Sequence, residues 1–140
     1  MADVYRHQIR VRYAECDAQG CVFNANYLTY FDVAMTEFWR ETGYSYAEMM
    51  DAGIDMVVAE AGVRYRRPVL FDEVATIEAR VTRLGTTSAG IALDVVCGGE
   101  LRAEGTLRYV FVRHGSSETT EIPPELRATM TPYLAEPEPT

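Results

Sequence analysis

A short stretch from Tyr13 to Tyr27 holds the residues of this chain that are best placed to do chemistry. It contains the carboxylate of Asp17, a turn-forming Gly20 and, from Asn26, the predicted start of an apolar helix. The first turn of a helix leaves backbone N–H groups unpaired at the positive end of the helix dipole. These groups can hold a carbonyl oxygen that gains negative charge, and Asp17 would then be the nearest reactive group.

The other polar residues of this stretch also have structural explanations. Asp17 itself can cap a turn, because an aspartate three residues before a glycine often does so. Cys21 lies near the predicted helix start, where the pKa of a thiol can be lowered, but His7 and His114 are distant in sequence. We therefore interpret Cys21 as a packed thiol and not as a nucleophile. Glu15 is expected to contact solvent or an arginine.

The composition excludes several classes of function. A net charge of −8 over 140 residues argues against nucleic acid as a partner, because binding to phosphate backbones needs clustered positive charge. All 13 basic residues are arginine, so there is no lysine to form a Schiff base. The three cysteines include no CxxC pair and indicate neither a disulfide framework nor a metal site. We expect no metal and no cofactor.

The hydrophobic pattern and the first residues predict the location of the chain. No apolar run approaches the roughly 20 residues that span a bilayer, so we expect no membrane insertion. The first residues lack an apolar segment followed by a small-residue cleavage site, and we predict a cytoplasmic protein. At this length we expect one domain over residues 1–134 and a flexible C-terminal tail over residues 135–140.

The helix predicted after Asp17 is the central element of the expected fold. Residues 26–42 place apolar side chains at helical spacing around most of the helix circumference. Such a helix needs cover on more than one side, which a sheet curled around it would provide. We expect Asn24 or Asn26 to cap its start and Gly43 to take the left-handed position after its end.

The remaining elements are mainly strands, recognised by alternation of apolar and polar residues. The last two are joined by Gly98-Gly99, a two-residue hairpin signal that favours antiparallel pairing. We predict the α+β class, with a five-stranded antiparallel sheet wrapped around one long central helix. The expected strands cover residues 8–13, 57–67, 75–82, 89–97 and 101–111, and short helices are expected at 46–52 and 126–130.

Several short motifs occur in the order and spacing of a known family. They are Asp17-Ala18-Gln19-Gly20, Asn26-Tyr27-Leu28, Tyr65-Arg66-Arg67-Pro68 and Asp72-Glu73-Val74. With them the chain, from about residue 5 to about residue 112, resembles the hotdog-fold acyl-CoA thioesterases of the 4-hydroxybenzoyl-CoA thioesterase type. The resemblance implies a sheet wrapped around the helix, a homodimer or homotetramer, and active sites shared across the dimer interface.

The resemblance also implies roles for residues of the Asp17 stretch. Asp17 matches the catalytic carboxylate, which acts on the thioester carbon as nucleophile or as general base for water. Gly20 matches the turn before the helix, and the backbone N–H near Asn24 matches the donor that polarises the thioester carbonyl. Many relatives carry histidine at the position of Asn24, so general-base capacity here belongs to Asp17 alone. Asn26 and Tyr27 are expected at the substrate-binding site.

Charged residues farther along the chain are candidates for substrate binding. A carboxylate at Asp32, inside the apolar helix, is costly to bury without a partner. It suits either a helix-to-strand hydrogen bond or arginine pair, or contact with a polar group of the acyl chain. Arg66, Arg67 and Arg83 are the candidates for binding CoA phosphates. The resemblance places a denser basic cluster of the 4-hydroxybenzoyl enzyme near the Arg83-Leu84-Gly85 turn. In this chain, Arg83 is the only basic residue of that turn.

The expected function is hydrolysis of an acyl-CoA thioester to a free acid and CoA. An acyl-carrier-protein thioesterase is the second choice, and a non-catalytic acyl-binding hotdog domain is the alternative from another class. A dehydratase-type hotdog enzyme is a third option, but that chemistry usually needs a histidine, which the loop lacks. The acyl group is open, with an apolar pocket expected from Tyr27, Tyr30, Phe31, Val57 and Val58.

Overall fold

The computed structural model describes residues 2–135 of the chain, which form an antiparallel sheet with helices. The predicted tail at 135–140 therefore lies, except for Ala135, outside the described residues. Single turns of 3-10 helix occur at Tyr13–Glu15 and Thr131–Tyr133. The main elements are β1 Tyr5–Arg10, α1 Asn26–Thr42, α2 Tyr46–Asp51, β2 Ile54–Tyr65, β3 Val74–Leu84, β4 Ser88–Cys97, β5 Glu100–Arg113 and α3 Pro124–Met130.

The five strands form one sheet in the order β1-β3-β4-β5-β2, and all neighbours pair antiparallel, as predicted. Buried and half-buried residues alternate along β3 and β4, so one face of the sheet is covered. Gly98 and Gly99 join β4 to β5 with φ angles of 59° and 75°. Two consecutive residues with positive φ angles form a tight hairpin turn, as the sequence predicted.

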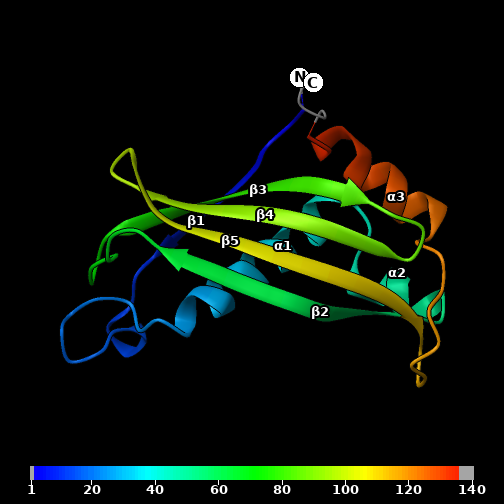
Figure 1. The fold of residues 1–140 in the computed structure, drawn as a ribbon, viewed down its shortest axis with the longest axis horizontal. Coiled ribbons are helices and arrows are strands. Elements are labelled where there is room, and N and C mark those ends of the chain that lie inside the picture. The colour runs from blue at the N-terminus through cyan, green and yellow to red at the C-terminus, as the bar shows by residue number, and fades with distance from the viewer. Residues whose placement is uncertain (1, 136–140) are drawn as a thin grey trace.

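Helix α1 lies against the covered face of the sheet, behind the strands in Figure 1. Its 17 residues include a buried row that contains Phe31, Ala34 and Phe38. The contact with β5 is close, because a Cβ added at Gly105 would lie 2.2 Å from Cε2 of Phe31. Glycine at position 105 thus leaves room for the aromatic ring of α1. The helix ends at Gly43, whose φ of 90° confirms the predicted left-handed cap.

The start of α1 differs from the prediction that Asn24 or Asn26 caps it. Ala25 is the N-cap residue, and no side chain caps the first turn. The amide Nδ2 of Asn26 instead donates to the carbonyl of Glu15 over 2.9 Å. Asn26 therefore fastens the loop before α1 to the segment that precedes Asp17.

Residues 11–13 also depart from the strand predicted at 8–13, since β1 already ends at Arg10. Tyr13–Glu15 forms a 3-10 turn because the side chain of Glu15 folds back on Arg12. Its Oε1 accepts the backbone N–H of Arg12 over 2.8 Å, and its Oε2 lies 2.5 Å from a guanidinium nitrogen of Arg12. This reciprocal bonding resembles a capping box and overrides the alternation of apolar residues.

Candidate active site

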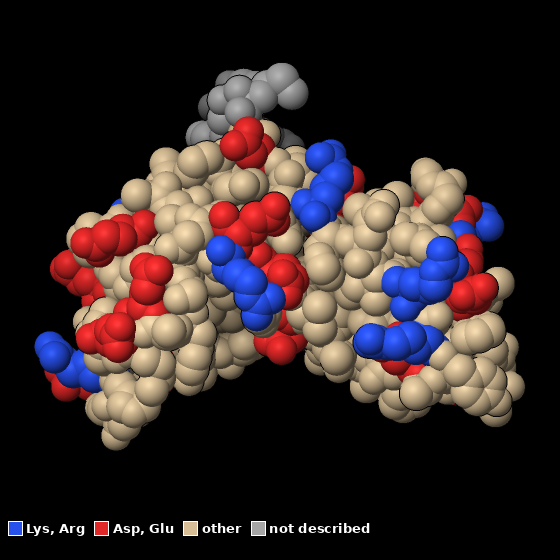
Figure 2. Space-filling view, turned by 180° about the vertical axis from the view of Figure 1, so that it is seen from behind, with Lys and Arg blue, Asp and Glu red and all other residues tan. Residues whose placement is uncertain are grey.

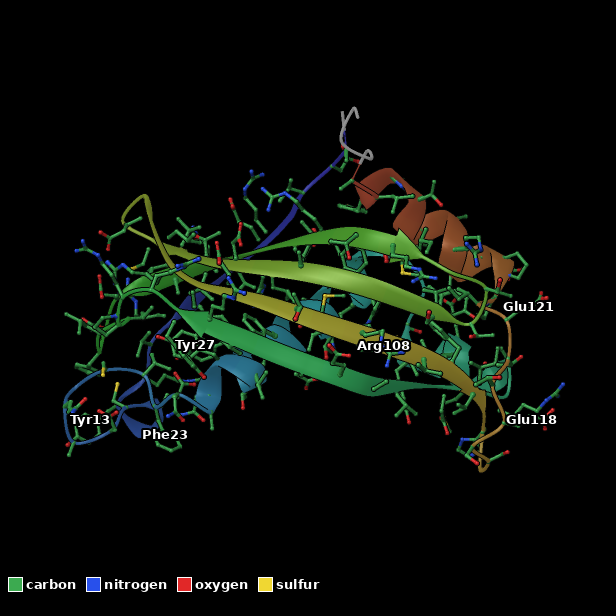
Figure 3. The ribbon with its side chains drawn as sticks, in the orientation of Figure 1. Tyr13, Phe23, Tyr27, Arg108, Glu118 and Glu121 are labelled. Atoms are coloured by element: carbon green, nitrogen blue, oxygen red, sulfur yellow. The ribbon has the colours of Figure 1, made fainter. Side chains whose placement is uncertain are left out.

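A hollow of about 310 Å³ opens beside Asp17, between the loop before α1, the start of α1 and the segment after β2. Figure 3 shows Phe23 and Tyr27 at this end of the molecule. The hollow brings together most of the residues that the sequence singled out. Its lining consists of Asp17, Gln19, Cys21, Val22, Phe23, Asn24, Tyr27, Tyr65, Arg66, Arg67 and Pro68.

Asp17 is held by a tight turn at the edge of the hollow. Its backbone N–H donates to the carbonyl of Cys21 over 2.9 Å, and Gly20 donates to the Asp17 carbonyl over 3.0 Å. The N–H of Gln19 donates to Oδ1 of Asp17 over 2.8 Å, which is an Asx turn. Gly20 has a φ of 80°, which favours glycine. Asp17 therefore both caps the turn and lines the hollow.

The turn that leads into α1 presents two backbone donors. Asn26 N donates to the carbonyl of Phe23 over 2.8 Å, and the Tyr65 hydroxyl donates to the carbonyl of Asn24 over 2.8 Å. Within residues 2–135, the N–H groups of Asn24 and Ala25 donate to no protein acceptor. Free N–H groups at a helix start are suited to an oxygen that carries negative charge.

Glu15 holds the turn before α1 in place through its backbone carbonyl and its side chain. Its backbone carbonyl accepts from the N–H of Phe23 over 2.9 Å, and its Oε1 accepts from the Tyr30 hydroxyl over 2.8 Å. Burial raises the pKa of Glu15, but the hydrogen bonds from Arg12 and Tyr30 outweigh this effect and leave the pKa below its ordinary value. Glu15 is thus an ionised partner of an arginine, which was one of its two predicted roles.

The Cys21 thiol lies next to the Asp17 carboxylate, with Sγ 3.7 Å from Oδ1 and 3.9 Å from Oδ2. Burial raises the pKa of Cys21, and the negative charge of Asp17 raises it further. A neutral thiol is a poor nucleophile. The structure therefore agrees with the interpretation of Cys21 as a half-buried thiol, but its contact with Asp17 was not foreseen.

Tyr27 forms the inner wall of the hollow. Its hydroxyl accepts from the N–H of Val69 over 3.4 Å, and its ring meets Tyr65 edge-on with centroids 5.1 Å apart. Burial raises the pKa of Tyr27 above its ordinary value. Arg66 and Arg67 stand at the exposed rim, 2.9 Å from Glu104 and 3.5 Å from Glu100. Both predicted cations thus already have carboxylate partners.

A half-buried ion pair between Arg102 and Glu73 holds the segment after β2 that contributes Pro68 to the hollow. Arg102 lies 3.1 Å from Oε1 of Glu73 and donates to the carbonyl of Pro68 over 2.8 Å. Glu73 also accepts the N–H of Leu70 over 2.8 Å. The hydrogen bonds from Arg102 and Leu70 lower the pKa of Glu73 to about 2. These bonds fix the chain between β2 and β3, where Leu70 pairs with Cys21 of the Asp17 turn.

Three predicted substrate-binding residues do not line the Asp17 hollow. The first is Asn26, whose side chain bonds to the carbonyl of Glu15. Asp32 is exposed on α1, not buried as expected, and faces a separate hollow of about 540 Å³ with Trp39 and Tyr109. Arg83 faces a third hollow, of about 240 Å³, on β3. Arg108 lines the same hollow, and Figure 3 shows it far along the sheet from Phe23.

The residues expected to line one apolar pocket also lie in different parts of the structure. Tyr27 lines the Asp17 hollow, whereas Tyr30 and Phe31 are fully buried core residues. Val57 and Val58 are about half exposed on β2, at 46% and 49%.

Neither a metal cluster nor a membrane-spanning helix occurs within residues 2–135. Figure 2 shows acidic and basic side chains interspersed over the face behind the sheet.

Comparison with known proteins identifies the family. The family model of the thioesterase-like superfamily matches residues 11–130. The acyl-CoA thioester hydrolase YbgC of Escherichia coli O6:H1 is 30% identical over 104 residues, which are 74% of each chain. The long-chain acyl-CoA thioesterase FadM of Escherichia coli K12 is 28% identical over 123 residues, 86% of this chain and 92% of FadM.

A solved structure is similar to this chain in sequence and in fold. The gentisyl-coenzyme A thioesterase BH1999 superposes with a TM-score of 0.78 at 26% identity, over 89% of this chain and 98% of that chain. The family match covers most of the chain, including the Asp17 turn, α1 and the five strands except β1. The chain therefore belongs to the thioesterase-like superfamily.

Proposed function

We propose that this protein hydrolyses an acyl-CoA thioester to a free acid and CoA, with Asp17 as the reacting carboxylate. The observation that carries the proposal is the presence of Asp17 and the turn of Asn24, with its unpaired N–H, at one hollow of about 310 Å³. Asp17 either attacks the thioester carbon, which expels CoA and leaves a mixed anhydride for water to cleave, or takes a proton from an attacking water. Gly20 serves both routes by allowing the turn.

The backbone N–H of Asn24 holds the thioester oxygen as it becomes negative. A donor of this kind contributes about 3 kcal/mol to stabilisation of the transition state, because it is oriented before the reaction begins. Its neighbour Ala25 offers a second N–H. The raised pKa of Cys21 supports the assignment of the chemistry to Asp17 and not to the thiol.

The CoA portion is assigned to the rim of the hollow. Arg66 and Arg67 are 50% and 69% exposed, and exposed ion pairs contribute only about 0–1 kcal/mol. CoA phosphates can therefore replace Glu104 and Glu100 as their partners. The names of YbgC, FadM and the gentisyl-CoA enzyme support CoA over a carrier protein. They differ in acyl group, so the 4-hydroxybenzoyl type, with Asp32 as a contact for a polar acyl group, is one option among several.

The proposal includes the hotdog arrangement, with the sheet curled around α1, and a homodimer or homotetramer. Its support is strand β2, which forms an edge of the sheet and exposes Val57 and Val58. An open edge strand carries unpaired backbone groups that a second copy can pair. Asp32 and Arg83, which lie away from the Asp17 hollow of their own chain, are proposed to contribute to substrate binding in the assembly.

The test is release of free thiol from a panel of aliphatic and aromatic acyl-CoAs, with the same acyl groups on an acyl carrier protein as the comparison. We expect faster release from CoA thioesters. Faster release from the carrier would establish the second choice. Saturable binding without release from any of them would show a non-catalytic acyl-binding domain.

A further inference from the structure

Tyr65, the last residue of β2, contacts the peptide bond between Asn24 and Ala25, just before α1. Its phenolic O–H donates to the carbonyl of Asn24 over 2.8 Å, and the two residues are 41 positions apart in the sequence. Tyr65 also lines the hollow that contains Asp17. We propose that Tyr65 is a positioning residue, whose hydroxyl orients the backbone N–H of Ala25, one of the two donors proposed to receive the thioester oxygen. This inference rests on the proposed function.

The planarity of the peptide bond links the Tyr65 contact to a donor. The carbonyl and the N–H on the two sides of one peptide bond point in opposite directions in a single plane. A bond to the carbonyl of Asn24 therefore fixes the direction of the N–H of Ala25. In the same way, the bond from Asn26 N to the carbonyl of Phe23, at 2.8 Å, fixes the N–H of Asn24. Each free donor is thus set by a bond on its own peptide.

The two peptides differ in how they are held. The carbonyl of Phe23 accepts from a backbone group inside the same turn, whereas that of Asn24 depends on a side chain from another element. The other bond to the Asn24 carbonyl, from Tyr27 N, is 3.4 Å long and thus beyond the usual range of N–H···O bonds. No side chain caps the first turn of α1. The Tyr65 hydroxyl is therefore the main restraint on this peptide.

The hydrogen bond from the Tyr65 hydroxyl to the Asn24 carbonyl also links two parts of the proposed site. Tyr65 directly precedes Arg66 and Arg67, whose backbone N–H groups both donate to the carbonyl of Arg102. The O–H bond thereby joins the rim assigned to CoA with the turn assigned to the carbonyl oxygen. The Tyr65 ring packs edge-on against Tyr27, and phenylalanine would keep this packing. Removal of the hydroxyl alone thus isolates the restraint on the Asn24 peptide.

The experiment compares Tyr65→Phe with Tyr13→Phe in steady-state hydrolysis of the best acyl-CoA substrate. Tyr13 is 81% exposed and lies outside the Asp17 hollow, so its variant controls for loss of a hydroxyl. We expect Tyr65→Phe to lower kcat about tenfold with KM changed less than about twofold, because misoriented donors weaken only the transition state. Tyr13→Phe should leave kcat and KM unchanged. Both variants are assayed well below their unfolding midpoints, so that loss of fold does not enter the rate.

An unchanged kcat for Tyr65→Phe would overturn the inference. A raised KM with unchanged kcat would also overturn it, because Tyr65 would then be a wall of the binding site only. If the unaltered protein hydrolyses no acyl-CoA, the proposed function itself fails and the inference fails with it. If the unaltered protein is active and the two variants behave alike, only the role of Tyr65 is refuted.

Discussion

Replacement of Glu73 by glutamine is expected to destabilise the protein in a pH-dependent way. The pKa of Glu73 is about 2, against an ordinary value of 4.5, because Arg102 and the Leu70 N–H bind its ionised form. At about 1.4 kcal/mol per pKa unit this gap corresponds to roughly 3.5 kcal/mol. The Glu73 side chain is 30% exposed and Arg102 is 13% exposed, so solvent screens part of the interaction. We expect Glu73→Gln to lower the free energy of unfolding by about 1–2 kcal/mol at pH 7.

The pH dependence has a definite sign. A carboxyl group whose pKa is lower in the folded state stabilises fully above its unfolded pKa, here near 4.5. This stabilisation is lost as the pH falls from 4.5 toward about 2. The difference in stability between the unaltered protein and Glu73→Gln should therefore shrink over that interval. Taking the difference cancels the titration of the other carboxylates.

Urea denaturation at several pH values between 2.5 and 7 measures this difference, with Glu104→Gln as the control. Glu104 pairs with Arg66 at 2.9 Å, but its side chain is 37% exposed, so its loss should cost less than about 1 kcal/mol. A Glu73→Gln protein as stable as the unaltered one at pH 7 would refute the reasoning. So would a stability difference that grows as the pH falls.

Two further predictions concern packing and assembly. Gly105→Ala would place Cβ 2.2 Å from the fully buried Phe31, so we expect a loss of about 3 kcal/mol in urea denaturation, partly recovered in the double variant with Phe31→Leu. A loss below about 0.5 kcal/mol would contradict the close packing of α1 on β5. Val58→Lys adds a charge to the open edge of β2, so sedimentation should show dissociation of the proposed homo-oligomer into monomers. A stable, active monomer before the substitution would contradict the proposed assembly.

Strong periodicity made much of the fold predictable. The bounds of α1 agree with the predicted helix over 26–42, because its apolar spacing and Gly43 both mark it. Strands β3, β4 and β5 were predicted from the alternation of apolar and polar residues, and along most of their length buried residues alternate with less buried ones. The turn at Tyr13–Glu15 was missed because a side-chain contact between Arg12 and Glu15 determines it. Periodicity does not report such a local exchange of hydrogen bonds.

The grouping of the candidate site residues was predicted where they are close in sequence, and less well where they are not. Asp17, Asn24 and Tyr27 share a hollow because one turn and one helix start contain them all. Arg83 lies nine positions after Val74 on β3. At about 3.3 Å per residue it is therefore roughly 30 Å from the start of that strand.

Two features of the site needed the tertiary structure. The contact between the Tyr65 hydroxyl and the Asn24 carbonyl was not predicted, because it joins residues 41 positions apart in the sequence. The place of Tyr65 in the Tyr65-Arg66-Arg67-Pro68 motif was the only signal. Asp32 was taken for a buried carboxylate because the helix around it is apolar, yet it lies on the exposed side together with Thr36 and Arg40. Single-residue orientation on a helix depends on which faces the sheet covers.

The most direct measurement compares acyl-CoA hydrolysis by Asp17→Asn and Asp94→Asn. Asparagine at position 17 can still accept the N–H of Gln19, so the turn is expected to survive while the carboxylate is lost. Asp94 pairs with Arg80 at 3.3 Å on the sheet and controls for removal of a negative charge. We predict that Asp17→Asn lowers kcat by at least about 100-fold with an unchanged circular dichroism spectrum, and that Asp94→Asn stays active. Hydrolysis by Asp17→Asn at the rate of the unaltered protein would contradict the role of Asp17.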